Sequence, residues 1–137
     1  MRRMKTIALV ASLAFALAAA TAEASARSFF QSPSGNIGCV MGAHGVRCDI
    51  REHDWIAPPK PASCELDWGS GVFVGRHGRA SIVCAGDATL GVGRHLAYGD
   101  AITSARFRCV SKRRGMRCVN RRNDHGFLLS RERARRF

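Results

Sequence analysis

A ten-residue unit that begins and ends with cysteine occurs twice in the chain, at residues 39–48 and 109–118. Eight residues separate the two cysteines of each unit, and an even number allows a symmetric β-hairpin in which the cysteines face each other. Directly opposed positions bring the Cβ atoms to roughly 4.5–5.5 Å, which is close to what a disulfide needs. The unit therefore predicts a β-hairpin closed by its own disulfide.

The symmetric register gives each hairpin an inner and an outer face. The inner positions of the first hairpin are all apolar, namely Ile37, Cys39, Met41, Val46, Cys48 and Ile50. Those of the second include two polar residues and are Phe107, Cys109, Ser111, Met116, Cys118 and Asn120. Gly45 and Gly115 lie just past the centre of each loop, where a left-handed residue suits a three-residue loop with a bulge. Such a bulge would break the symmetric register, so the exact pairing stays open.

Residues 1–26 have the pattern of a secretory signal peptide. Three basic residues precede an apolar run at 7–20, and an Ala-x-Ala cleavage site follows at 24–26, with 22–24 as the alternative. The run has 14 residues, fewer than the roughly 20 that span a bilayer, so we expect cleavage and no transmembrane segment. The protein is therefore predicted to be secreted or periplasmic, with one disulfide-stapled domain at 27–137.

The six cysteines of an exported chain of this length imply three disulfides. The repeat selects Cys39–Cys48 and Cys109–Cys118, which leaves Cys64–Cys84. Nineteen residues separate that last pair, so its bridge either ties a strand end to the preceding loop or crosses a bulge. Zinc is the competing interpretation of the cysteines. Because no Cys-x-x-Cys pair occurs and the compartment is oxidising, we predict no metal site.

No stretch of the mature chain shows helical periodicity, so the expected fold class is mainly β, a small antiparallel sheet or barrel-like domain of disulfide-closed hairpins. Residues 66–74 and 80–84 flank a glycine-bounded loop and predict a further hairpin. The proline-rich segment 51–61 is a connection, in which Asp54-Trp55-Ile56 is expected to dock on the sheet. The glycine-rich segment 85–93 is expected to be irregular.

The end of the chain has a short apolar stretch followed by charged residues. Residues 127–130 are predicted as the last strand. Residues 131–137 are expected to form a basic tail that is either a helical turn or disordered.

Several short motifs are similar to one known type. They are Pro33-Ser34-Gly35-Asn36-Ile37-Gly38-Cys39, Cys64 to Gly69, Cys84 to Asp87, Leu96 to Gly99, the 109–118 unit, and Asn120 followed by His125-Gly126-Phe127 and Ser130. On these residues the chain resembles a family of small exported bacterial proteins of unknown function, with a PSGNI-x-C element and six cysteines. The resemblance implies the fold and export, but no activity, cofactor or catalytic residue. Segment 120–125 departs from it, because a less basic turn with a glycine is expected there.

The positive charge of the chain is concentrated near its end. The formal charge of +12 falls to +10 without residues 1–26, residues 27–105 are neutral overall, and residues 106–137 carry twelve basic residues against two acidic ones. Eleven of those twelve are arginines, which suit bidentate contacts with phosphate or carboxylate. The candidate anion-binding residues are Arg108, Lys112, Arg113, Arg114, Arg117, Arg121 and Arg122.

This charge has several interpretations. The simplest is a solvated basic surface that keeps a small exported protein soluble. The functional one is docking on an anionic lipid, an acidic polysaccharide or an acidic protein outside the cytoplasm. Specific nucleic-acid binding is not expected, since an exported protein rarely meets nucleic acid and few aromatic residues are available for stacking. An alternative is an exported inhibitor of an acidic enzyme that presents the loop Lys112-Arg113-Arg114.

A small hydrolase is the remaining alternative. His125 with Ser130, and Asp87 or Asp100, is the one set that could be assembled, and no nucleophile-elbow sequence surrounds the serine. The histidine and the aspartates are ordinary turn residues. We therefore predict no catalytic residue and no cofactor, and the sequence does not indicate an oligomeric state.

Overall fold

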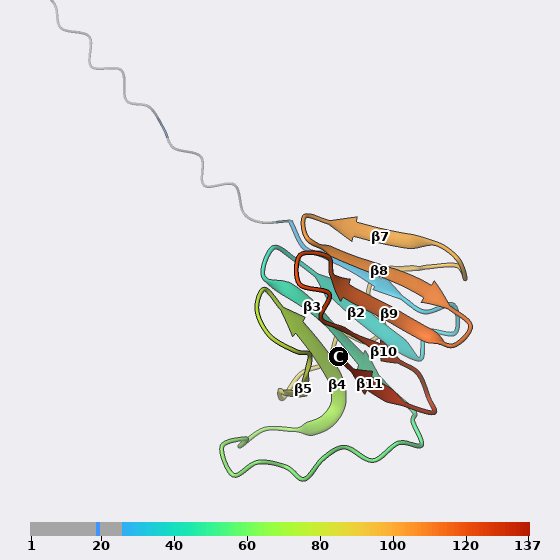
Figure 1. Ribbon diagram of the computed structural model, residues 1–137. Helices are drawn as coiled ribbons and strands as arrows, with labels where there is room; N and C mark the ends of the chain where they lie inside the picture. Colours follow the sequence, from blue (N-terminus) through green and yellow to red (C-terminus); the bar gives the residue numbers. More distant parts are fainter. Residues whose placement is uncertain (1–18, 20–25) are drawn as a thin grey trace, which may run out of the picture.

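The structure is a computed structural model that describes residue 19 and residues 26–137. The predicted signal peptide lies outside the described residues, apart from those two of its positions. Strands and turns make up the described part of the chain, which confirms the mainly β fold class. The strands form two sheets that pack face to face (Figure 1).

The first sheet has six strands in the order β5-β4-β3-β2-β1-β6. They are β1 (Ser28–Gln31), β2 (Ile37–Met41), β3 (Gly45–Ile50), β4 (Trp68–Gly75), β5 (Ser81–Cys84) and β6 (Arg94–His95). All neighbours in this sheet are antiparallel except β1 and β6, which are parallel. The predicted hairpin at 66–84 corresponds to β4 and β5.

The second sheet has five antiparallel strands in the order β11-β10-β9-β8-β7. They are β7 (Ala101–Ser104), β8 (Phe107–Lys112), β9 (Gly115–Asn120), β10 (Gly126–Leu129) and β11 (Ala134–Arg136). The expectation of a helical turn or disorder at 131–137 is wrong, because this segment pairs with β10 as an edge strand. Strand β10 is therefore not the last strand of the chain.

The two repeated units are the central hairpins β2–β3 and β8–β9, one in each sheet. Cys39 lies opposite Cys48, and Cys109 lies opposite Cys118, in the symmetric register. Pairing continues to Lys112 opposite Gly115, so the bulged alternative does not occur at that tip. The disulfides join Cys39 to Cys48, Cys64 to Cys84 and Cys109 to Cys118, which is the pairing derived from the repeat.

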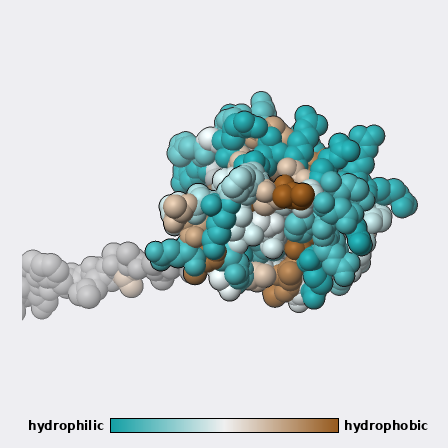
Figure 2. Space-filling view, turned by 90° about the horizontal axis from the view of Figure 1, so that it is seen from below, coloured by the Kyte–Doolittle hydropathy of each residue, from teal (hydrophilic) through white to brown (hydrophobic). Residues whose placement is uncertain are grey.

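The hydrophobic core lies between the inner faces of these hairpins. Both sets of inner-face residues predicted from the repeat are buried, including the polar Ser111 and Asn120. Phe30, Phe107 and Phe127 fill the core with their rings. Seen from below, the surface is mainly hydrophilic, and its hydrophobic residues form small separate patches (Figure 2). This face therefore has no broad apolar area of the kind that marks an obligate interface.

The remaining disulfide staples the outer edge of the first sheet. Cys84 lies opposite Trp68, and the register shifts by a bulge between Trp68 and Val72. Cys64 precedes β4 in the loop, so the bridge ties a strand end to the preceding loop, one of the two arrangements expected from its spacing.

The connection between β3 and β4 docks through one side chain. Trp55 Nε1 donates a hydrogen bond to the Ser130 carbonyl at 3.0 Å, and its ring stacks on His53. Ile56, in contrast, is 94% exposed, so the expectation that it docks is wrong. The tryptophan has both a polar partner and an apolar surface to cover, whereas its neighbour in the extended chain points away.

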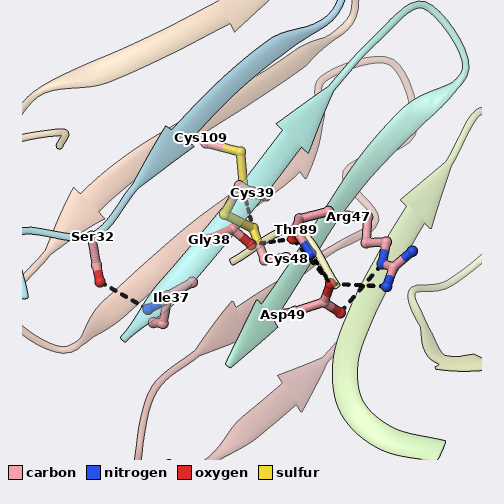
Figure 3. Close-up of a disulfide and its surroundings, with 10 residues drawn as sticks. Ser32, Ile37, Gly38, Cys39, Arg47, Cys48, Asp49, Thr89 and Cys109 are labelled. Carbon is pink, nitrogen blue, oxygen red and sulfur yellow. Dashed lines mark hydrogen bonds and ion pairs between the residues drawn. A yellow bond between two sulfur atoms is a disulfide. The ribbon is translucent and has the colours of Figure 1, made fainter. Parts of the chain in front are cut away.

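The segment 85–93 has no strand, as expected, but it covers the outer face of the first sheet (Figure 3). The Thr89 N–H donates to Asp49 Oδ2 at 2.7 Å, and its hydroxyl donates to the Gly38 carbonyl at 2.6 Å. Arg47 forms ion pairs with Asp49 at 2.9 Å and with Asp87 at 3.0 Å. A Cβ at Gly38 would overlap the Thr89 backbone, so only glycine permits this close approach.

Candidate anion-binding surface

The outer face of the second sheet alternates arginines with aliphatic side chains. Residues paired across antiparallel strands point to the same face. One such row runs from β8 to β11 and consists of Val110, Arg117, Leu128 and Arg135. The next row consists of Thr103, Arg108, Val119 and Gly126. The arginines are exposed and the aliphatic residues half-buried, so the face is open to solvent.

Phe137 packs on this face beside the arginines of the first row. Its backbone N–H and carbonyl both pair with Gly126 at 3.0 Å, which extends the ladder of β11 by one residue. The guanidinium carbons of Arg117 and Arg135 lie 5.3 and 5.7 Å from the centre of its ring. Such cation–π contacts hold the guanidinium groups over the sheet while leaving their N–H edges free to bind anions.

The tip of the β8–β9 hairpin presents three further cations. Lys112, Arg113 and Arg114 are exposed, and the guanidinium of Arg113 lies 5.0 Å from the ring centre of Tyr98. Within residues 26–137, none of the three forms an ion pair with a carboxylate. Their charge is therefore available to an external anion.

A second group of cations lies at the opposite end of this hairpin. Arg121 and Arg122 are there in the β9–β10 turn, and the structure adds Arg106 and Arg76 from two other turns. The Arg76 carbonyl accepts a bond from Asn120 Nδ2 at 3.2 Å, which fixes the β4–β5 turn at this end. Desolvation, and then repulsion from Arg76 and Arg122, lower the pKa of Arg106 below its ordinary value.

The seven residues predicted from the sequence therefore do not form one compact cluster. They divide into the tip, the outer face with Arg108 and Arg117, and the opposite end of the hairpin. A six-residue strand such as β8 separates the two ends by about 20 Å. The result is a basic stripe along the second sheet, which suits an extended anionic surface better than a single small anion.

The sequence missed the cations that come from elsewhere in the chain. Arg76 lies in the neutral part of the sequence, and only the packing of the two sheets brings it to Arg106 and Arg122. The charge count alone gives Arg135 no defined face, whereas the pairing of β11 aligns it with Arg117. A charge run shows that cations are present, but the strand register decides where they gather.

A cleft of about 630 Å³ opens beside the tip, between the ends of the two sheets. Its walls come from the turn at 32–36, from residues 51–52, from the hairpin tip and from residues 130–132. Ile37 and Met116 form its apolar floor, and both side chains are buried. The volume is within the range of small-molecule sites in proteins, roughly 300–1,000 Å³.

The structure separates the residues considered for a hydrolase. His125 and Ser130 flank β10 at its two ends, about 16 Å apart along an extended strand. The Ser130 hydroxyl oxygen accepts the Arg133 N–H at 3.2 Å, as part of the turn into β11. Asp87 pairs with Arg47 over the other sheet, and this hydrogen bond and charge lower the pKa of Asp87. His125, Ser130 and Asp87 therefore do not lie together as a catalytic set.

Both tryptophans have hydrogen-bond partners within the protein. Trp55 donates to Ser130, and Trp68 Nε1 donates to the Pro58 carbonyl at 2.8 Å. Among the residues that the structure describes, no group of three or more His, Cys, Asp or Glu side chains is arranged to hold a metal ion. The described part of the chain also has no helix of the length and apolarity that a membrane crossing requires.

Residues 8–137 match the model of a family described as Family of unknown function (DUF6636). The chain belongs to this family. The sequence motifs resembled a family of unknown function with six cysteines. The DUF6636 match and the six cysteines of this chain agree with that much of the resemblance. No curated protein and no solved structure matches the chain. The three disulfides of this DUF6636 protein indicate an oxidising environment, extracellular or periplasmic.

Proposed function

We propose that this protein is an exported binding module that docks on an extended anionic partner through the outer face of its second sheet. In this proposal residues 1–26 are a cleaved signal peptide, and residues 27–137 are the mature domain. The partner lies outside the cytoplasm and is an anionic lipid surface, an acidic polysaccharide or an acidic protein. The binding residues are Arg108, Lys112, Arg113, Arg114, Arg117, Arg121 and Arg122.

The observation that carries the proposal is the arrangement of the arginines along the β8–β9 hairpin. Arg108 and Arg117 project from the same face, between cationic groups at both ends of the strands. In the described part of the chain, neither residue forms an ion pair. Repulsion between unpaired guanidinium groups in a row raises the free energy of the isolated protein, and a bound polyanion would relieve that repulsion.

A contrast within the molecule supports the same proposal. Arg47, on the outer face of the first sheet, is neutralised by Asp49 and Asp87. Burial acts to lower the pKa of Arg47, but its hydrogen bonds to these carboxylates and their charges raise it. The protein thus pairs its arginine where a loop covers the sheet, and leaves arginines unpaired where the sheet is open.

The test is binding of the mature protein to anionic and neutral lipid vesicles, and to polygalacturonate and dextran, across a salt series. We expect binding to the anionic members of each pair, with affinity that falls steeply as salt screens the contacts. Replacing Lys112, Arg113 and Arg114 together by serine should weaken binding at least about tenfold. The matched control replaces Arg27, Lys60 and Arg94 by serine, which removes the same charge away from the stripe.

Equal weakening in both triple variants would show that net charge alone is responsible, and absence of binding at low salt would exclude docking on simple polyanions. Binding to a folded acidic enzyme without binding to polyanions would favour the alternative, an exported inhibitor that presents its hairpin tip. The comparison therefore distinguishes binding at the hairpin tip from attraction by the net charge of the whole protein.

A further inference from the structure

The cleft beside the hairpin tip is open to solvent, and one of its walls is held by hydrogen bonds. Its wall at 33–36 is fixed to segment 51–52 by Asn36, whose Nδ2 donates to the Glu52 carbonyl at 3.0 Å and whose Oδ1 accepts the Glu52 N–H at 2.9 Å. The backbone N–H of Arg51 also donates to the Asn36 carbonyl at 2.9 Å. These bonds hold the wall in place before any ligand arrives.

Two serine hydroxyls in this wall have protons to donate. Ser32 Oγ accepts the Ile37 N–H at 3.0 Å, a bond drawn in Figure 3, and Ser34 Oγ accepts the Asn36 N–H at 3.2 Å. The two oxygens lie 3.5 Å apart, so one hydroxyl can donate to the other. At least one hydroxyl proton then remains for a ligand, because each serine supplies one donor.

A third hydroxyl reaches the cleft from its floor. Ser111 is 1% exposed and lines the cleft. Among residues 26–137, no hydrogen bond of its hydroxyl to another residue is found, yet every fully buried side-chain polar atom in that range has a partner. The Ser111 hydroxyl therefore lacks a protein partner where the residue lines the cleft. A buried hydroxyl of this kind gains from a ligand that can bond to it.

The rim of the cleft has four basic residues against two carboxylates, Glu52 and Glu132, so its net charge is positive. Arg51, Lys112 and Arg113 line it, and within the described residues none of them has a carboxylate partner. Arg131 is also present, but it is bound to Glu52 at 3.3 Å and Asp54 at 3.6 Å. Three free cations, hydroxyl donors in the wall and an apolar floor are complementary to a small molecule that has an anionic group, several hydroxyls and an apolar ring face.

We propose that this cleft binds a sugar-sized, polyhydroxylated anion, such as an acidic sugar or a sugar phosphate. The anionic group lies between Arg51, Lys112 and Arg113, and the hydroxyls of the ligand bond to Ser34 and Ser111. This site shares Lys112 and Arg113 with the docking stripe, but it lies between the sheets, and Ser34, Asn36 and Arg51 come from outside the basic third of the chain. Binding of the small ligand does not require that the stripe bind a polyanion.

The test is titration of the mature protein with glucuronate and with glucose 6-phosphate, followed by backbone amide shifts in NMR spectra. Glucose, acetate and inorganic phosphate are the controls, because each carries only part of the proposed chemistry. We expect saturable shifts at Ser34, Asn36 and residues 111–113, with at least about tenfold higher affinity for one of the two anionic sugars than for any control. Whichever of the two binds more tightly distinguishes a carboxylate from a phosphate ligand.

Two variants locate the site, and one serves as the matched control. Ser111→Val and Arg51→Ser should each weaken the anionic sugar about tenfold. The double variant Arg27→Ser, Lys60→Ser, at two exposed cations outside both the cleft and the stripe, should bind it unchanged. If Ser111→Val lowers the melting temperature, the exposed Arg51→Ser decides the outcome on a native fold.

Unchanged affinity of both cleft variants would overturn the proposal. So would shifts spread over the whole basic face without saturation, or equal affinity for acetate, phosphate and the anionic sugars. A protein that binds polygalacturonate but none of the small sugars would retain the docking stripe and lose the cleft site, so the two proposals fail separately.

Discussion

The Sγ atoms of Cys48 and Cys118 lie 3.9 Å apart, so the disulfides of the two repeated hairpins touch across the core. Both sulfurs are already in disulfides, and neither carries a proton, so the contact is van der Waals packing and not a hydrogen bond. Each disulfide closes its own hairpin and also packs in the core against the disulfide of the other hairpin.

Removing a central disulfide should therefore cost more than its loop length predicts. Chain entropy alone assigns about 2.7 kcal/mol to a loop of the size closed by Cys39–Cys48 and about 3.3 kcal/mol to that of Cys64–Cys84. Because Cys39 and Cys48 are fully buried, whereas Cys84 is exposed, we expect the reverse order. The double alanine variant of the central pair should lose about 4–5 kcal/mol, against about 3 kcal/mol for the peripheral pair.

Guanidinium denaturation of the two double variants measures both losses. A larger loss for the peripheral pair would mean that loop entropy dominates and that the central sulfurs contribute little to packing.

Asn120 joins the two sheets at the opposite end of the hairpin from the cleft. Its side chain is 0% exposed, Nδ2 donates to the Gly75 carbonyl at 3.0 Å, and Oδ1 accepts the Arg122 N–H at 3.0 Å. Asn120→Ala should lower the free energy of unfolding by about 2–3 kcal/mol, because it leaves these buried groups without partners. Thermal and chemical denaturation check this value. Arg122→Ala, an exposed change in the same turn that keeps the backbone N–H, should stay within about 0.5 kcal/mol of the parent.

Ala105 has a left-handed backbone, with φ of +49°, in the two-residue turn between β7 and β8. Glycine adopts this conformation without steric cost, so Ala105→Gly should raise the unfolding free energy by up to about 1 kcal/mol. In the described part of the chain, Ala105 and Asp124 are the only residues apart from glycines that have a positive φ. The neighbouring Arg106 therefore has a negative φ. Arg106→Gly should therefore destabilise, and a gain in both variants would contradict the explanation.

The ion pair between Arg47 and Asp87 should make the attachment of segment 85–93 to the first sheet sensitive to acid. Arg47 lowers the pKa of Asp87 in the folded state, first through its hydrogen bond and then through its charge. The stabilisation is therefore fully present above the unfolded carboxyl pKa of about 3.9, and it is lost as pH falls below that value. Asp87→Asn should be less stable than the parent at neutral pH, and the difference should shrink toward pH values of about 3 and below.

Denaturation of the parent and the variant across pH measures this difference, which should be small because Asp87 is exposed. A difference that stays constant with pH would mean that Asp87 acts without its charge.

The parts of the fold that could be predicted depend on short-range patterns. The two hairpins follow from the cysteine spacing and from alternation with period two, both of which are local in sequence. β11 could not be predicted in this way, because 131–137 is a charged segment with no apolar alternation. Its strand forms through backbone bonds to β10 and through Phe137, whose partner Gly126 is known only once the chain has folded.

The turn at 120–125 shows the same limit. A glycine was expected there from the resemblance, and Asp124 takes the left-handed conformation instead, with φ of +62°. Aspartate tolerates this conformation better than most residues, but the composition of the turn does not reveal which residue adopts it.

The sequence could predict most of the cations of the candidate site, but not how they are arranged. The concentration of arginine near the end of the chain identified the cations, since charge can be counted without a fold. The division into a stripe with two ends depends on strand register, and the cleft is made by segments that lie far apart in sequence. The sequence shows Ser111 only as a polar member of an inner face, because its place in the cleft lining depends on segments far apart in the sequence.

The contacts of Thr89 and Arg47 hold segment 85–93 over the outer face of the first sheet, whereas the outer face of the second sheet is open. The two sides of the molecule therefore differ. The arginine on the side of the first sheet is matched by carboxylates. A molecule attached by its second sheet would turn this charge-paired side outward. Bound copies would then coat an anionic surface as a single layer without bridging it to another, so vesicles at saturation should stay dispersed rather than clump.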